Sequence, residues 1–303
     1  MSTSPFSDGS TKFGLASCAT YGLPGITTSI DHYLSLYLRE RFLPGVFRAN
    51  AHPTTFHDWR HLITAGTEST TAMGAFLATA AIHTSWTNRS LKLVATRYYN
   101  SVVKASRRGI ADGEVDGSED WVLHATNFLC LFEINQGWNT GHNPSGAAPY
   151  LEGMARILKI RIAKDSKRPT DFVHPPNRVA AESLVLFTWT LSFYYSDVDR
   201  AGEAIEWDSL SVYLEPNVFS GASMQTNSPL LGSNWELYRI IIEIVRLSHN
   251  VPFDSISWCH GRELELELNR REEELYAERD KVVDVTERFE VVLEQTLLYV
   301  LVT

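Results

Sequence analysis

Several polar side chains that could bind a ligand stand within otherwise apolar stretches. Glu133 is the clearest case, because it lies in "CLFEINQGW", among residues typical of a protein core. A carboxylate is rarely buried without a partner. The simpler interpretation is that Glu133 pairs with a basic residue of the scaffold, and the functional one is that it points into a polar spot of a cavity. Candidates of the same kind are His83, His124, Asp197 and the neighbouring pair Tyr194 and Tyr195.

Two histidines have the spacing of a metal-binding pair. His57 and His61 in "HPTTFHDWRHL" are four residues apart, so on a helix both imidazoles would lie on one face, with His52 nearby. A usable site needs a third and a fourth ligand, and the sequence lacks the H-E-x-x-H signature. A solvated histidine face is therefore favoured, and we predict no metal site.

The sequence contains none of the common motifs of nucleophilic or phosphate chemistry. The G-x-S-x-G, catalytic-cysteine, G-x-G-x-x-G and Walker A patterns are all absent. Cys130, in "NFLCLFEI", is most simply a core thiol. We therefore expect no nucleotide chemistry and no cofactor.

Composition and charge indicate a globular intracellular protein. The 303 residues are 44% hydrophobic and 21% charged, which is enough to bury a large core. A net charge of −9 disfavours direct binding to nucleic acid, which depends on Lys and Arg. Three widely spaced cysteines, Cys18, Cys130 and Cys259, suit a reducing compartment. The longest uncharged apolar tract, residues 183–196, is too short to span a membrane, so no membrane association is expected.

Apolar periodicity predicts an all-α protein, because strand signals are scarce. We expect a flexible segment over residues 1–27, which is rich in Ser, Thr, Gly and Pro, followed by one irregular helical domain over residues 28–303. That domain should hold about nine to eleven helices without a regular repeat. Helices are expected over residues 29–43, 67–84, 88–108, 118–136, 149–162 and 177–196, and from Ser233 onward, with Pro44, Gly45, Gly109 and Gly137 as stop signals.

One segment is ambiguous between strand and helix. In "GRELELELNRREEEL", residues 263–268 alternate with period two, as a half-buried strand would. However, Leu264, Leu268 and Leu275 fall on one helical stripe, and Glu, Leu and Arg favour helices. We predict a helix here.

The stretch "SPLLGSNWELYRIIIEIVRLS" contains a sharply started apolar helix. Ser233 is the expected N-cap, and Glu236, three residues on, would complete a capping box. Its apolar residues cover most sides of the helix beside a narrow charged stripe. This helix should therefore pack within the core of the protein.

Five stretches of the sequence carry a recognisable pattern, at residues 96–110, 122–138, 150–158, 193–201 and 228–244. Together they resemble the fungal transcription-factor regulatory domain, the helical domain that usually follows a binuclear zinc-cluster DNA-binding module. "TRYYNSVVKASRRGI" resembles its tyrosine-bearing helix, and "VLHATNFLCLFEINQGW" the next apolar helix. "YLEGMARIL" is similar to its short Gly-bearing segment, with Tyr150 where His is usual and Met154 where Ala is usual. "FYYSDVDRA" and "SPLLGSNWELYRIIIEI" resemble its aromatic-Asp and Pro-Leu-x-Gly elements.

Two departures shape what this resemblance implies. The six-cysteine zinc cluster with its basic linker is missing, and the sequence ends in "TLLYVLVT", where the family continues. The resemblance implies an all-α fold and a stand-alone regulatory or interaction protein of the nucleus, without its own DNA-binding module. An apolar small molecule as ligand and a protein as partner are secondary expectations from the family.

An enzyme that reuses this scaffold is the alternative. A cytoplasmic enzyme of fungal secondary metabolism could guide cyclisation or isomerisation of an apolar intermediate with shape, desolvation and one or two hydrogen-bond donors. It would need a closed apolar cavity with convergent polar groups. The candidate ligand-binding residues are His124, Glu133, Trp138, Tyr194 and Asp197.

Overall fold

The computed structural model describes residues 23–52, 66, 68–141, 144–165, 174–223, 226–250 and 252–279. Within these ranges the chain forms helices and no strand, packed as a single domain, which confirms the predicted all-α class. If the continuous stretch formed by α1, a π-helical turn and α2 is taken as one helix, the described part holds ten helices besides two short 3-10 turns. None of them is long and apolar enough to cross a membrane.

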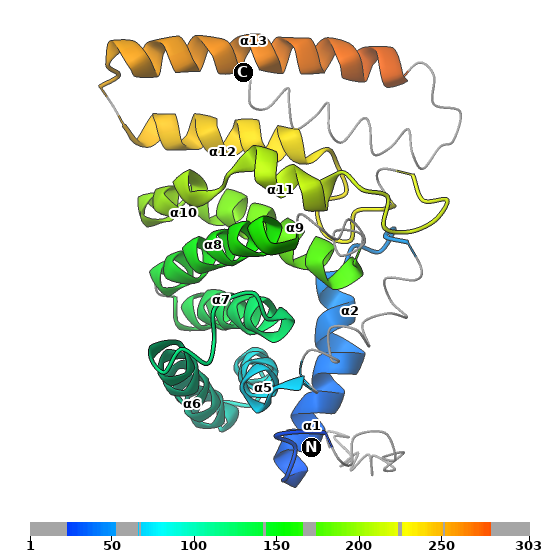
Figure 1. Ribbon diagram of the computed structural model, residues 1–303, viewed down its shortest axis with the longest axis vertical. Coiled ribbons are helices and arrows are strands. Elements are labelled where there is room, and N and C mark those ends of the chain that lie inside the picture. Colours follow the sequence, from blue (N-terminus) through cyan, green and yellow to red (C-terminus); the bar gives the residue numbers. More distant parts are fainter. Residues whose placement is uncertain are drawn as a thin grey trace, which may run out of the picture.

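The first half of the chain packs around a central helix, α5. The helix is almost wholly buried because its residues are small or apolar on every side, and the Ser69 hydroxyl caps its first turn by accepting from the backbone N–H of Thr71 at 3.2 Å. The α1–α2 rod, α6 and α7 pack against it (Figure 1), and the rings of Phe76 and Phe128 lie 4.2 Å apart. The bounds are α1 Ser29–Tyr37, π turn Leu38–Phe42, α2 Leu43–Val46, α5 Thr70–Thr84, α6 Leu91–Ala111 and α7 Asp120–Thr140.

Helix α7 is shared between two cores. Phe128 and Phe132 face the core around α5, whereas Leu123 and Ile134 face a second core that the following helices form. This double burial explains why α7 is apolar nearly all round its surface. The helices of the second core are α8 Ala148–Asp165, α9 Pro175–Ser192, α10 Asp199–Ala204, α11 Trp207–Leu214 and α12 Trp235–His249.

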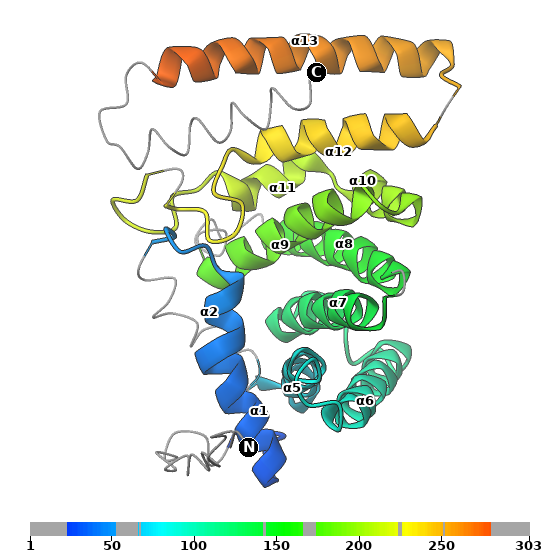
Figure 2. The same ribbon diagram turned by 180° about the vertical axis from the view of Figure 1, so that it is seen from behind.

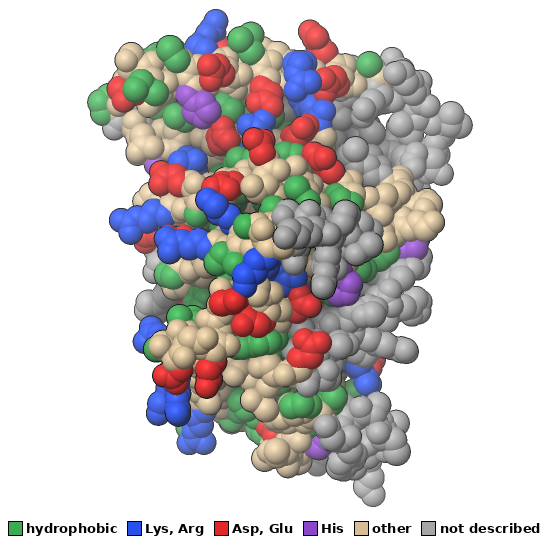
Figure 3. Space-filling view, in the orientation of Figure 1, with side chains coloured by type: hydrophobic (Ala, Val, Ile, Leu, Met, Phe, Trp, Pro, Cys, Tyr) green, Lys and Arg blue, Asp and Glu red, His purple; other side chains and the backbone are tan. Residues whose placement is uncertain are grey.

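The last described helix, α13 Ser255–Arg279, lies across one end of the molecule beside α12 (Figures 1 and 2). Leu264 and Leu268 pack into a small core with four residues of α12, so the prediction of a helix over residues 263–268 is confirmed. Acidic and basic side chains mix on the outer face of this layer (Figure 3), and Glu267 accepts from Arg239 of α12.

The predicted capping box of Ser233 and Glu236 is wrong. Asn234 is the N-cap of α12, and its Oδ1 accepts from the backbone N–H of Glu236 at 3.0 Å. The turn before it ends at Gly232 with a φ of +72°, where an added Cβ would also collide with the Arg48 guanidinium. Because the chain leaves that turn one residue later than expected, Asn234 reaches the capping position.

Helix ends were the other source of error in the sequence-based prediction. α7 was expected to stop at Gly137 but runs on to Thr140, and Gly141, with a φ of +66°, caps it. Gly137 instead allows Pro144 to pack closely against α7, because an added Cβ at Gly137 would lie 2.7 Å from the Cβ of Pro144. Likewise α6 continues past Gly109 to Ala111, and α9 ends at Ser192 rather than at residue 196.

Candidate ligand-binding groove

A groove of about 450 Å³ lies between α6, α7 and α8. Its walls are mainly apolar, and its volume falls within the range of about 300–1,000 Å³ that small-molecule sites occupy. The apolar lining residues are Val103, Ile110, Val115, Trp121, Val122, Ala125, Leu129, Pro149 and Ile157.

The spacing of the lining residues along each helix places them on the face that borders the groove. On α7, Trp121, Ala125 and Leu129 recur every four residues and so share one face. On α8, Tyr150 and Gly153 are three residues apart and line the opposite wall. Gly153 leaves the groove open, because among the described atoms an added Cβ would have a single neighbour within 4 Å, Cγ2 of Thr126 at 3.7 Å.

One of the polar residues that line the groove, Tyr150, is hydrogen-bonded to a second tyrosine that does not line it. The hydroxyl oxygen of Tyr150, which lines the groove, lies 2.8 Å from that of Tyr99 on α6. Burial raises the pKa of both phenols, and the nearby carboxylate of Glu133 raises the pKa of Tyr99 further. Both hydroxyls therefore stay protonated at neutral pH, so one proton forms the bond between them and the other can be donated to a further acceptor.

Two charged residues stand at the groove, and one of them is compensated. Asp116 accepts from the Nζ of Lys164 at 2.5 Å, which lowers the pKa of Asp116. Arg107 is exposed and forms no ion pair with any residue in the described ranges. The groove therefore presents one uncompensated positive charge beside its apolar walls.

The five residues expected to bind a ligand do not converge. Trp138, Tyr194 and Asp197 are exposed, with 53% and 75% of the surface of the first two accessible. His124 is buried on the side of α7 that faces α9. None of the five lines the groove, and Glu133 comes nearest, as a neighbour of Tyr99 and Tyr150.

Glu133 has a different environment from the one that its sequence context favoured. No basic side chain in the described part of the chain forms an ion pair with it. Its carboxylate instead lies against Gly146, where an added Cβ would come within 2.5 Å of Oε2, and beside the Tyr99 hydroxyl. Glu133 does not line the groove, so its position in a polar spot of a cavity stays a prediction.

His124 belongs to a polar seam, which we define as Asp120, His124 and Asn127 of α7 with Arg161 of α8 and Asn177 of α9. Arg161 donates to Asp120 and, at 3.3 Å, to Oδ1 of Asn177. Three side-chain atoms of the seam are buried and form no hydrogen bond with any residue in the described ranges, namely His124 Nδ1, Asn127 Oδ1 and Arg161 Nε. Burial lowers the pKa of His124 to about 4, so its imidazole is neutral at pH 7.

A buried ion pair on α9 was missed by the sequence-based prediction. Glu182 is fully buried and accepts from Nε of Arg178 at 2.5 Å. The other Glu182 oxygen accepts from the backbone N–H groups of Leu230 at 2.7 Å and Leu231 at 3.2 Å, which fixes the turn before α12. The available signal was an Arg and a Glu four residues apart in an otherwise apolar helix.

The histidine pair with metal-binding spacing and the cysteines lie away from the groove or outside the described residues. His57 and His61 lie outside the described residues, and within those ranges no three His, Cys, Asp or Glu side chains gather as a metal site would require. Cys130 is buried and Cys259 exposed, and both are free thiols.

Comparison with known protein families, with curated proteins and with solved structures finds no match for this chain.

Proposed function

We propose that this protein binds an apolar small molecule in the groove between α6, α7 and α8, and acts as a stand-alone regulatory or interaction protein. The observation that carries the proposal is the groove itself, with its apolar walls, the Tyr150 hydroxyl and the uncompensated charge of Arg107. A ligand that fills it gains about 0.8 kcal/mol for each methylene group removed from water.

The resemblance to fungal transcription-factor regulatory domains supports the same proposal. Three of the stretches that carry the resemblance, residues 96–110, 122–138 and 150–158, supply most of the groove-lining residues. As a regulator the protein would act in the nucleus, through a protein partner that contacts DNA in its place.

Filling the groove is the direct test. Gly153→Leu places a side chain in the open space and suits the helix better than glycine, so the domain should stay folded. The probe is N-phenyl-1-naphthylamine, a neutral dye that fluoresces in apolar sites. We expect the substitution to weaken dye binding by at least about tenfold, a loss of about 1.4 kcal/mol.

Gly261→Leu is the matched control for this experiment. Gly261 also lies inside a helix, α13, and an added Cβ there would meet no atom of the described residues within 4 Å. Dye binding should be the same in this variant as in the unmodified protein. Equal binding by the Gly153→Leu variant would show that the dye does not occupy the groove and would contradict the proposal.

An enzyme that guides cyclisation or isomerisation of an apolar intermediate of secondary metabolism is the second candidate. Its specific support is Tyr150, a protonated hydroxyl held by Tyr99 at the wall of an apolar groove, where a hydrogen bond to a developing negative charge is stronger than in water. The test is turnover of apolar metabolites by the pure protein. Turnover that Tyr150→Phe slows would favour the enzyme, which would act in the cytoplasm.

A further inference from the structure

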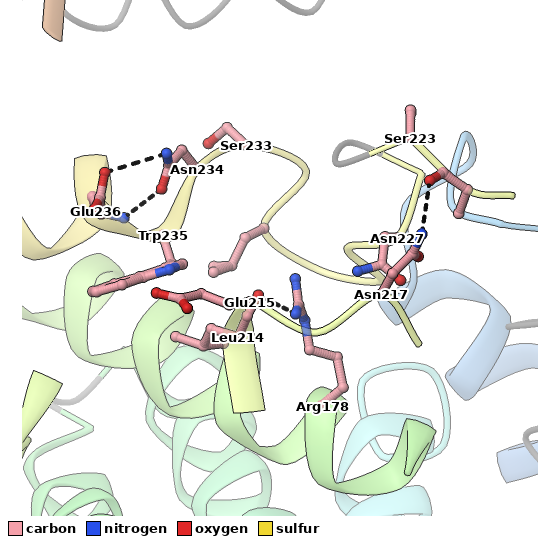
Figure 4. A pocket seen from close by; sticks show the side chains of 12 residues that line it. Arg178, Leu214, Glu215, Asn217, Ser223, Asn227, Ser233, Asn234, Trp235 and Glu236 are labelled. Atoms are coloured by element: carbon pink, nitrogen blue, oxygen red, sulfur yellow. Dashed lines mark hydrogen bonds between the residues drawn. The ribbon is translucent and has the colours of Figure 1, made fainter. Parts of the chain in front are cut away.

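A second pocket, of about 340 Å³, lies over α9 between the end of α11 and the start of α12 (Figure 4). It shares no residue with the groove. Leu214, Leu231 and Trp235 form its apolar part, and the indole of Trp235 is held by stacking on Trp207, with ring centroids 6.1 Å apart.

The floor of this pocket carries a buried guanidinium. The side chain of Arg178 is only 6% exposed, and Figure 4 shows it pointing from α9 into the pocket. Its Nε donates to Glu182 and its Nη1 donates to the carbonyl oxygens of Tyr213, at 3.2 Å, and Leu214. Nη2 forms no hydrogen bond with any residue that the structure describes, and it is not among the fully buried atoms, so it faces the pocket.

The wall carries an unpaired carboxylate. Glu215 follows the last residue of α11 and is exposed, and its carboxylate forms no hydrogen bond or ion pair in the described part of the chain. Figure 4 shows its carboxylate between Trp235 and Arg178. Glu236, the other acid at this pocket, is already engaged, because its Oε2 accepts from Arg271 at 2.6 Å.

We propose that this pocket binds a small zwitterion, an amino acid with an apolar side chain. Its carboxylate would accept from Nη2 of Arg178, its ammonium group would pair with Glu215, and its side chain would pack on Leu214, Leu231 and Trp235. A simple anion would be repelled by Glu215, and a simple cation would leave Nη2 without an acceptor. This proposal does not depend on the function of the groove.

Calorimetric titration of the full chain with three related probes tests the pairing of both charges. L-phenylalanine carries both charged groups, whereas 3-phenylpropionate lacks the ammonium group and 2-phenylethylamine lacks the carboxylate. We expect L-phenylalanine to bind at least about tenfold more tightly than either of the others, since each lost charge-assisted hydrogen bond is worth that much.

Substitution of Glu215 separates its role from that of the rest of the pocket. Glu215→Gln removes the charge from a side chain with no structural partner, and should weaken L-phenylalanine binding about tenfold while leaving 3-phenylpropionate binding no weaker. Glu114→Gln, at another exposed glutamate, should change neither. The proposal is overturned if L-phenylalanine gives no binding at millimolar concentration, if either analogue binds as tightly, or if Glu215→Gln binds L-phenylalanine unchanged.

Discussion

The hydroxyl oxygens of Tyr99 on α6 and Tyr150 on α8 lie 2.8 Å apart. The ring of Tyr99 also stacks on Phe132 of α7, with centroids 4.4 Å apart. One side chain therefore links all three helices that form the groove, and the hydrogen bond helps to set the distance between its walls.

Removing either hydroxyl should weaken this link. We expect Tyr99→Phe and Tyr150→Phe each to lower the free energy of unfolding by about 1 kcal/mol, because each leaves a part-buried partner without its hydrogen bond. Urea denaturation of the two variants and of the double variant measures the coupling between the residues. Tyr194→Phe, at a side chain that is 75% exposed, is the control and should change nothing. Strictly additive effects would contradict a direct bond.

Arg107 should select ligands with an acidic group. Decanoate and decanol have the same apolar chain, so the difference in their ability to displace the dye reports the charge. We expect the unmodified protein to prefer decanoate at low salt and Arg107→Gln to lose that preference. Arg108→Gln is the neighbouring control, since Arg108 pairs with Asp112 and does not line the groove. Selectivity that survives in Arg107→Gln would refute the role.

Glu182 should be among the most sensitive positions in the protein. Glu182→Gln leaves the guanidinium of Arg178 buried without a counter-charge, so we expect a loss of about 3–5 kcal/mol in the free energy of unfolding. Urea denaturation at pH 7 measures this loss. Glu152→Gln breaks an exposed pair with Arg156 of the same i, i+4 type and should cost less than about 1 kcal/mol. Equal effects of the two substitutions would contradict the assigned burial.

His124 should make the protein sensitive to mild acid. Burial lowers its folded-state pKa to about 4 from an ordinary value of 6.5, so the unfolded chain binds a proton more readily. The contribution of the neutral imidazole to the free energy of unfolding is therefore fully present above pH 6.5. It is lost as the pH falls from 6.5 to 4, and the whole loss amounts to about 3 kcal/mol.

Replacement of His124 with Leu isolates this effect. His124→Leu removes both the titrating group and a buried nitrogen without a partner, so unfolding free energies at pH 7 should change little or rise. Between pH 6.5 and 4, the free energy of unfolding should change less steeply with pH in this variant than in the unmodified protein. Urea denaturation across this range gives both, and an unchanged slope would assign the acid sensitivity to other groups.

The helices were largely predictable from the sequence, because each buries apolar residues at a helical period. The buried faces of α5, α7, α9 and α12 are visible as such in the sequence. Their ends were less predictable, because several residues compete for each cap. Asn234 rather than Ser233 caps α12, and Gly141 rather than Gly137 ends α7, since packing of the neighbouring turn decides between them.

The groove was not predictable in the same way. It depends on how far α6, α7 and α8 stand apart and on the missing side chain of Gly153, and neither property appears in the periodicity of one helix. Glu133 stood out because a lone acid in an apolar run is unusual, and this led close to the tyrosine pair. Tyr150 itself is an ordinary residue in its own helix and gains significance only from Tyr99 on another.

The bond between Glu182 and the backbone of Leu230 spans 48 residues, which has a consequence for synthesis on the ribosome. At about 5–20 residues per second, Leu230 is added roughly 2 to 10 s after Glu182. Until then the nascent α9 carries a carboxylate whose second oxygen lacks the backbone donors that later satisfy it. The second core of the protein therefore cannot close co-translationally until the turn before α12 has left the exit tunnel.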